Sequence, residues 1–248
     1  MREIHFYLVS FFLLPVLFWQ GHKARKRIPR LPEASGPDFK EWSGSNRIRL
    51  LAIGESTVAG VGIPTYPDSL TGQVASVLGK KTGRRISWKA MGKSGITARE
   101  AVQKFGSQLP PRAPDVLVLA LGANDVMNLS SRRSWISDLE GMIEVCRNSY
   151  PETPIFIAGV PPLGIFPALP WALRFILGWK AVLLDKASGT LSSGLQNVFH
   201  IPMRKIRSIP LEGFFCSDGF HPSIKGCSLW GEEIAESIHS VLQRKISV

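Results

Sequence analysis

The sequence predicts an α/β fold in which helices cover both faces of a parallel β-sheet. Short apolar segments alternate with longer segments whose apolar residues recur at helical spacing. The segment VLVLAL at residues 116–121 is continuously apolar, as expected for a strand buried on both faces. The chain has 248 residues, 44% of them hydrophobic, so it can bury a sizeable core. Strands that alternate with helices indicate a parallel sheet.

The expected elements follow one another from residue 47 onward. Strands are expected at residues 47–53, 86–90, 116–121, 155–158 and 198–201. Helices are expected at residues 68–80, 97–105, 134–149, 180–195 and 223–243. Asp68 is a typical capping residue for the first helix, and Trp135, Leu139 and Ile143 share one face of the third. In such sheets the functional groups gather at the carboxyl ends of the strands.

The N-terminal segment is the most apolar part of the chain. Residues 4–19 read IHFYLVSFFLLPVLFW, which is shorter than the roughly 20 residues that span a bilayer comfortably. The flanks differ from those of a signal peptide, because Glu3 offsets Arg2 and no small-residue cleavage site follows. A basic run comes next, made of Lys23, Arg25, Lys26, Arg27 and Arg30. Residues 1–22 are therefore expected to form an uncleaved anchor or an in-plane membrane helix, and the alternative is a helix buried against the domain.

The rest of the domain organisation follows from this segment. Contact with a membrane surface is expected through residues 4–30, with the basic run against anionic headgroups. The positive-inside rule places the folded domain on the cytoplasmic side, with a periplasmic domain as the alternative. Residues 23–46 are rich in Pro, Gly, Ser and charge without any period, which predicts a linker. The folded domain is expected at residues 47–248.

Charge and cysteine content exclude several other classes of protein. The net charge is +11, but the basic run follows lipid-like sequence and no nucleic-acid module is present, so a nucleic-acid partner is not expected. Three cysteines are too few for a disulfide framework, and no Cys-x-x-Cys pair indicates a metal site. Free thiols are expected, and one bridge between Cys216 and Cys227 stays open.

Polar residues at the predicted strand ends form a catalytic pattern. Ser56, Gly95 and Asn124 follow the first three strands, and Asp218 and His221 precede the last helix. A serine hydroxyl is a weak nucleophile until a base takes its proton, and His221 is the expected base. Asp218 is expected to hold the imidazole tautomer. The amides of Ser56 and Gly95 and the side chain of Asn124 are the expected oxyanion donors.

These residues lie in blocks that resemble the SGNH hydrolase superfamily, the GDSL-type lipases and esterases. The blocks are Gly-Glu-Ser-Thr at 54–57, SGIT at 94–97, GAND at 122–125 and DGFHPS at 218–223, and the resemblance covers about residues 47–242. It implies a three-layer α/β/α sandwich with a flavodoxin-like parallel sheet, and neither a metal nor an organic cofactor. Two positions depart from the family pattern: Glu55 stands where Asp is usual, and Met91 stands where Asn often precedes the first glycine.

The substrate is indicated by the apolar segment at residues 160–179, VPPLGIFPALPWALRFILGW. This segment is expected either to pack in the core with one amphipathic helix or to form an acyl-binding wall or lid. Trp171, Arg174, Trp179 and Lys180 are residue types found at lipid interfaces. The expected function is a serine hydrolase that cleaves lipid-like or other hydrophobic acyl esters. The alternatives are a carbohydrate O-acetyl esterase and a non-catalytic, membrane-associated binding module.

Overall fold

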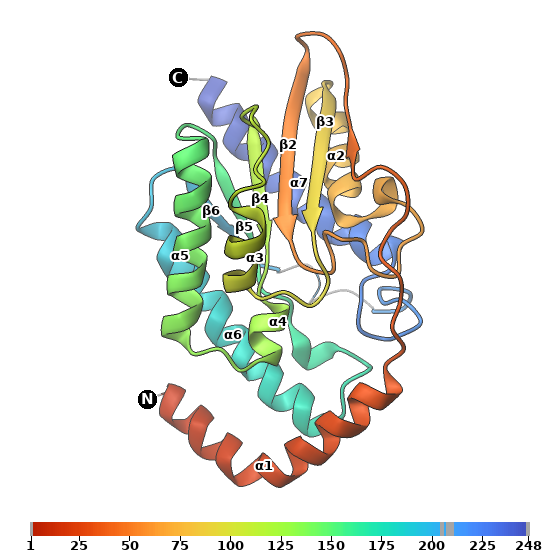
Figure 1. The fold of residues 1–248 in the computed structure, drawn as a ribbon, viewed down its shortest axis with the longest axis vertical. Helices are drawn as coiled ribbons and strands as arrows, with labels where there is room; N and C mark the ends of the chain where they lie inside the picture. Colours follow the sequence, from red (N-terminus) through yellow and green to blue (C-terminus); the bar gives the residue numbers. More distant parts are fainter. Residues whose placement is uncertain (1, 204–205, 207–210, 247–248) are drawn as a thin grey trace.

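The computed structural model describes residues 2–203, 206 and 211–246, and it is a three-layer α/β/α sandwich (Figure 1). The central sheet has six strands in the order β1-β3-β2-β4-β5-β6. The strands are β1 (Phe39–Lys40), β2 (Arg47–Gly54), β3 (Arg85–Gly92), β4 (Val116–Ala120), β5 (Ile155–Ala158) and β6 (Val198–Ile201). Strands β2 to β6 pair in parallel, as predicted, and β1 is an antiparallel edge strand. Strand β2 thus lies between β3 and β4.

Helices cover both faces of the sheet. They are α1 (Arg2–Arg27), α2 (Leu70–Thr82), α3 (Ala98–Phe105), α4 (Ala123–Met127), α5 (Arg132–Ser149), α6 (Trp171–Ser193) and α7 (Ile224–Ile246), with short 3-10 turns η1 (Tyr66–Asp68) and η2 (Leu163–Ile165). Helices α3, α5 and α6 pack on one face, and α2 and α7 pack together on the other. The alternation of strands and helices therefore predicted the layers correctly.

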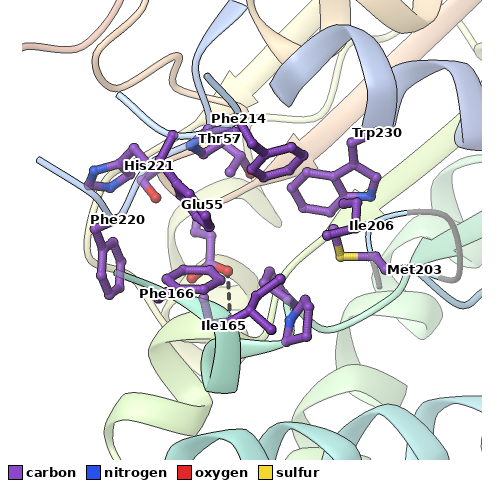
Figure 2. A pocket seen from close by; sticks show the side chains of 16 residues that line it. Glu55, Thr57, Ile165, Phe166, Met203, Ile206, Phe214, Phe220, His221 and Trp230 are labelled. Carbon is purple, nitrogen blue, oxygen red and sulfur yellow. Dashed lines mark hydrogen bonds between the residues drawn. The ribbon is translucent and has the colours of Figure 1, made fainter. Parts of the chain in front are cut away.

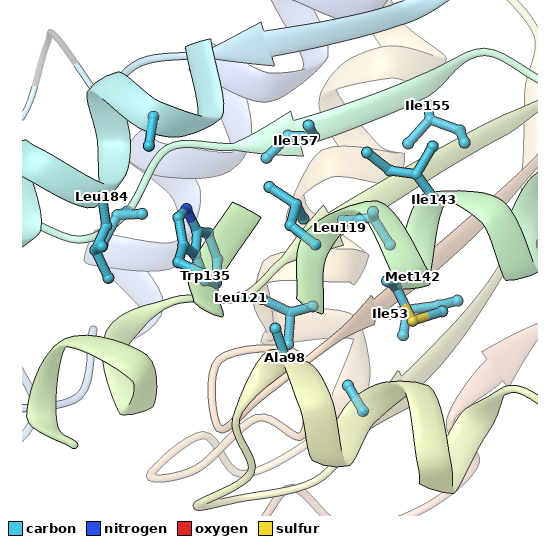
Figure 3. Packing of buried hydrophobic residues seen from close by; sticks show 14 of the residues in the cluster. Ile53, Ala98, Leu119, Leu121, Trp135, Met142, Ile143, Ile155, Ile157 and Leu184 are labelled. Atoms are coloured by element: carbon cyan, nitrogen blue, oxygen red, sulfur yellow. The ribbon is translucent and has the colours of Figure 1, made fainter. Parts of the chain in front are cut away.

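Two hydrophobic clusters fill the space between the layers. In the first, Ile53 and Leu119 of the sheet meet Trp135 and Met142 of α5, and Leu184 of α6 closes the cluster (Figure 3). In the second, the opposite face of the sheet packs on α2 and α7. Successive strand residues point to opposite faces, so a buried strand contributes to both clusters at once. This explains the continuously apolar strands in the sequence.

The edge strand β1 and the start of α6 were not predicted. The expected linker at residues 23–46 contains the last turns of α1 and the strand β1, in which Phe39 lies opposite Lys89 of β3. A two-residue strand is too short to give a periodic pattern. Helix α6 begins at Trp171 rather than at residue 180, because Pro170 starts it and its mostly apolar first half hides the helical period.

Helix α1 packs against α6, although it is long and apolar enough to cross a membrane between Ile4 and Arg27. Phe6 and Ala24 are buried, while most of the other apolar side chains of α1 are exposed. The helix bends in the middle, where it contains Pro15 (Figure 1). One face of α1 therefore packs on the domain, and the other is exposed.

Candidate active site

Ser56 lies in the turn that directly follows β2. The turn is tight: a Cβ on Gly54 would lie 2.4 Å from the carbonyl oxygen of Ala120, so only glycine fits there. The Glu55 amide donates to that same carbonyl at 3.2 Å, which ties the turn to β4. The side chain of Ser56 is largely buried. The sequence thus places Ser56 on a rigid, closely packed turn.

Asp218 and His221 form a hydrogen-bonded pair in the loop before α7. The Nδ1 atom of His221 lies 2.6 Å from Oδ2 of Asp218. The other carboxylate oxygen accepts from the amides of Phe220 and His221 at 2.9 and 3.0 Å. Burial raises the pKa of Asp218, but these hydrogen bonds outweigh it and hold the pKa below its usual value. The carboxylate is therefore charged at neutral pH, and Nε2 is the imidazole nitrogen left for a substrate or nucleophile.

Ser56 and His221 line the same pocket. Figure 2 shows Phe220 and His221 at one end of the pocket and Trp230, Ile206 and Met203 at the other. The rest of the lining is mostly apolar and consists of Glu55, Thr57, Ala123, Pro161, Pro162, Ile165, Phe166, Phe214, Phe215 and Pro222. No hydrogen bond joins Ser56 to His221 among the described residues. The pocket therefore holds the expected nucleophile and base beside an apolar chamber.

The expected oxyanion donors follow the three adjacent strands β3, β2 and β4. Within the described part of the chain, neither the Ser56 amide nor the Gly95 amide donates a hydrogen bond. Gly95 has a φ of +83°, a conformation that favours glycine, and it is exposed in the loop after β3. Asn124 lies in the first turn of α4 and is half-buried. Neither Gly95 nor Asn124 lines the pocket itself, whereas Ala123 does.

Glu55 makes hydrogen bonds in the site that the sequence did not reveal. Its carboxylate accepts from the amides of Ala123 and Asn124 at 2.8 and 3.0 Å, and from the side-chain nitrogen of Asn124. It thereby joins the turn of Ser56 to the start of α4. Burial raises its pKa to about 7, with a further rise from Asp125, against the lowering effect of the three hydrogen bonds. In the sequence, these contacts were hinted at only by the glutamate at residue 55, where the family usually has an aspartate.

Residues 52–229 match the GDSL-like lipase/acylhydrolase family. The chain belongs to this family. No curated protein matches the sequence. Family membership makes ester hydrolysis the general class of reaction.

Solved structures share the fold of this GDSL-like chain at low sequence identity. A family 3 carbohydrate esterase of Clostridium thermocellum is 18% identical with a TM-score of 0.62, over 79% of this chain and 98% of that one. A lipase/acylhydrolase from Enterococcus faecalis is 20% identical with a TM-score of 0.58, over 78% and 96%. The lipase Lip_vut3 from a goat rumen metagenome is 15% identical with a TM-score of 0.59, over 76% and 96%. These neighbours support the SGNH fold and include enzymes with different substrates.

A second buried carboxylate joins two further blocks of this GDSL-like site. Oδ2 of Asp125, in α4, accepts from the amide of Ala98 at the start of α3 at 3.0 Å. Burial raises the pKa of Asp125 to about 6. Asp125 thus links the block of Asn124 to the block of Gly95, and the sequence pattern did not predict this bond.

The apolar segment at residues 160–179 lies partly in the wall of the pocket and partly in a helix. Its first part lines the pocket through Pro161, Pro162, Ile165 and Phe166, and its second part is the start of α6. The ring of Phe166 lies 5.1 Å from that of Phe220, which in turn lies 5.2 Å from the imidazole of the next residue. The segment is therefore in direct contact with the loop that carries His221.

The three cysteines are free thiols, so the structure does not contain the bridge that the sequence left open. The Sγ atoms of Cys216 and Cys227 lie 3.3 and 3.9 Å from the same carbonyl oxygen, that of Pro222. Burial raises the pKa of both thiols. Among the described residues, no group of three or more His, Cys, Asp or Glu side chains gathers as a metal site would require.

Proposed function

We propose that this chain hydrolyses carboxylic esters by two-step acyl transfer through Ser56. The observation that carries the proposal is that Ser56 and His221 line one pocket while Asp218 holds Nδ1 of the same imidazole. This arrangement supplies a nucleophile, a base and a group that fixes the tautomer of the base. The oxyanion donors would be the amides of Ser56 and Gly95 and the side chain of Asn124.

In the first step, Oγ of Ser56 attacks the ester carbonyl carbon and Nε2 of His221 takes the hydroxyl proton. The carbonyl oxygen becomes an oxyanion, which the amides of Ser56 and Gly95 and the Nδ2 group of Asn124 stabilise. The amides are suited to this because they have no competing acceptor within the described residues. Collapse of the intermediate breaks the bond to the alcohol oxygen, which receives the proton from His221 and leaves.

In the second step, water attacks the acyl-serine carbonyl while His221 takes its proton. The second tetrahedral intermediate expels Ser56, which regains the proton from His221, and the carboxylic acid leaves. Asp218 stabilises the imidazolium form that appears twice in the cycle. Its lowered pKa supports this, because it remains charged throughout.

Glu55 is a positioning residue in this mechanism. One N–H of the Asn124 amide group is directed to Glu55, which leaves the other N–H for the oxyanion. The same carboxylate anchors the two backbone amides at the start of α4. Glu55 would therefore fix the direction of the Asn124 side chain before substrate arrives.

The favoured substrate is an ester with a hydrophobic acyl group. Beyond Ser56 the pocket is lined by Met203, Ile206, Phe214 and Trp230, which offer an apolar surface to an acyl chain. A carbohydrate O-acetyl esterase is the second candidate, because two structural neighbours are family 3 carbohydrate esterases. A binding module without catalysis is disfavoured, because it would not need a nucleophile and a base in one pocket.

Hydrolysis of p-nitrophenyl esters from acetyl to long acyl chains separates these candidates. Turnover by wild type that Ser56→Ala abolishes would support the hydrolase. An optimum at medium or long chains would support the hydrophobic substrate, and an optimum at acetyl would support the deacetylase. Folded wild type that turns over no chain length would contradict the proposal of a general esterase.

The chain is also proposed to attach to a membrane through its N-terminal helix. Residues 4–19 are apolar and the basic run follows them, in the order expected for contact with anionic headgroups. The basic run favours a domain on the cytoplasmic side, with the periplasmic side as the alternative.

A further inference from the structure

We propose that α1 lies in the plane of the membrane and that α1 and the first turns of α6 form one lipid-binding surface. This inference extends the proposed membrane attachment and does not depend on the ester chemistry. It assigns to the hydrolase domain itself a direct contact with lipid. The partner is the surface of an anionic bilayer.

The first argument is that both halves of α1 contact α6. The buried or half-buried residues of α1 include a row that repeats alternately at four and three positions: Phe6, Ser10, Leu13, Leu17, Gln20 and Ala24. Near one end, the ring of Phe6 lies 5.6 Å from that of Trp179. Near the other, Oε1 of Gln20 accepts from the amide of Leu173 at 3.3 Å. Both halves of the bent helix are therefore held by the folded domain.

A buried lysine strengthens this attachment. Lys180 of α6 is only 2% exposed, and its Nζ lies 5.2 Å from the ring centroid of Phe6 and 5.9 Å from that of Tyr7. If α1 crossed the bilayer apart from the domain, Lys180 would lose these two rings and Gln20 would enter the hydrocarbon. The contacts with α6 thus favour a helix that stays docked and lies flat.

The second argument is that the outer face of α1 is apolar and that no part of the chain described by the structure covers it. This face consists of Ile4, Tyr7, Leu8, Phe11, Phe12, Leu14, Phe18 and Trp19, all at least half exposed. An exposed apolar patch of this size is typical of a surface that binds a partner or a membrane. Two large side chains of α6 extend the same kind of surface, since Trp171 is 63% and Phe175 is 53% exposed.

The charges next to this surface identify lipid as the covering. The exposed basic residues Arg25, Lys26 and Arg27 end α1, and Arg174 lies between Trp171 and Phe175 in the sequence of α6. Nζ of Lys23 lies 4.8 Å above the ring of Trp19. Aromatic rings beside lysine and arginine match the boundary between acyl chains and anionic headgroups, whereas two copies of this surface would bring like charges together.

The position of the surface has a consequence for the pocket. Phe166 lines the pocket, and Trp171 begins the lipid-binding part of α6 only five positions later. The amide of Ala168, between them, donates to the carbonyl of Gly219 in the loop of Asp218 and His221 at 3.1 Å. Lipid contact at Trp171 would therefore lie next to the wall of the pocket.

The first test is vesicle flotation of the full chain. Wild type should float with vesicles of phosphatidylcholine and phosphatidylglycerol in equal amounts, and less with phosphatidylcholine alone. The double variant Trp171→Ser/Phe175→Ser should bind the anionic vesicles about tenfold more weakly. Phe39→Ser is the matched control, because Phe39 is 51% exposed on the edge strand β1 and should bind like wild type.

Two results would overturn different parts of the inference. Wild-type binding by the double variant would show that α6 does not touch lipid. Failure of wild type to bind any vesicle would also contradict the membrane attachment. If the chain were a soluble dimer that binds no lipid, the covering of this surface would be a second copy of the chain and not a bilayer.

The second test separates a flat helix from a spanning one. Protease is added to spheroplasts and to inverted membrane vesicles from cells that express the chain with tags before residue 1 and after residue 248. A flat helix predicts that both tags are cleaved from the same side. Cleavage from opposite sides would show that α1 spans the membrane and would overturn the in-plane orientation.

Discussion

The side-chain nitrogen of Asn124 donates a hydrogen bond to the buried carboxylate of Glu55, which directly precedes Ser56. This bond connects two residues that are 69 positions apart, and it joins the turn after β2 to the start of α4. In the proposed mechanism it orients an oxyanion donor. It also explains how a glutamate can serve where the family usually has an aspartate, since its carboxylate reaches three donors of α4 at once.

Glu55→Gln should lower kcat about tenfold to 100-fold and leave KM nearly unchanged, because the oxyanion forms only after binding. The neutral amide accepts fewer hydrogen bonds and turns a donor toward Ala123 or Asn124. Steady-state kinetics on a soluble p-nitrophenyl ester measures the effect. Asn124→Ala should lower kcat by a similar factor, and the double variant should have a kcat no lower than that of Asn124→Ala alone. If the fold-losses in kcat of the two single variants multiplied in the double variant, Glu55 would not act through Asn124.

The stability of the protein should depend on the protonation of Glu55. Its pKa rises from 4.5 in water to about 7 on folding, so the folded state binds this proton more tightly. The resulting stabilisation is fully present below pH 4.5 and is lost as the pH rises through about 7. The loss is about 3 kcal/mol in the free energy of unfolding. Urea unfolding between about pH 4 and pH 8 should show it in wild type and not in Glu55→Gln.

Asp125→Asn is the matched control for that experiment. Burial raises the pKa of Asp125 to about 6, so its effect has the same sign and is complete at a lower pH. The asparagine variant should lose this lower step and keep the step that ends near pH 7. An unchanged pH dependence in both variants would contradict the assignment of these two carboxyl groups.

Asp218→Asn should lower kcat by about 10³-fold to 10⁴-fold without unfolding the protein. The asparagine oxygen can still accept from the amides of Phe220 and His221, so the loop should keep its conformation. Its NH₂ group would face Nδ1 and favour the wrong imidazole tautomer. Kinetics and circular dichroism on the same sample test both parts. Full activity in this variant would show that His221 does not need its carboxylate partner.

Phe166→Leu should change the preference for acyl length. Phe166 lines the pocket and packs against Phe215 and Phe220, so a smaller side chain enlarges the apolar chamber. We expect kcat/KM to rise for bulky acyl groups relative to acetyl, measured as a ratio within one preparation. Phe199→Leu is the control, because Phe199 stacks on Phe156 and does not line the pocket. If the ratio of kcat/KM for bulky acyl groups to kcat/KM for acetyl were the same in Phe166→Leu and Phe199→Leu, Phe166 would not select the substrate.

Removal of residues 1–30 should move the protein to the soluble fraction and leave turnover of a short ester largely intact. None of the described side chains of α1 lines the pocket. The melting temperature should fall, because the truncation uncovers the side of α6 that contacts Phe6. Fractionation, thermal melting and hydrolysis of p-nitrophenyl acetate check the three expectations. A folded but inactive domain would argue that α1 is part of the catalytic unit.

Local patterns predicted most of the layers of this fold. Strands such as β4 are short and continuously apolar, and α5 presents Trp135 and Leu139 to the core at helical spacing. These signals depend only on neighbouring residues, so they can be read directly from the sequence. The order of the strands cannot be read from neighbouring residues, because the pairing of β2 with both β3 and β4 joins residues that are far apart in the sequence.

The parts that were missed depend on contacts between distant residues. Phe6 meets Trp179, and Glu55 meets Asn124, across spacings that no local period encodes. Strand β1 has only two residues, and its place is set by pairing with β3. The blocks around Ser56, Asn124 and His221 indicated a shared site, whereas the carboxylates of Glu55 and Asp125 that hold the blocks together required the structure.

Covalent labelling by a fluorophosphonate tests the central claim most directly, because it reports an activated serine without knowledge of the substrate. Mass spectrometry of wild type should find one phosphonylated residue, Ser56. Ser56→Ala should take up no label, and His221→Ala should label far more slowly because the base is missing. A label on a different serine, or a folded wild type that stays unlabelled, would contradict the assignment of Ser56 as the nucleophile.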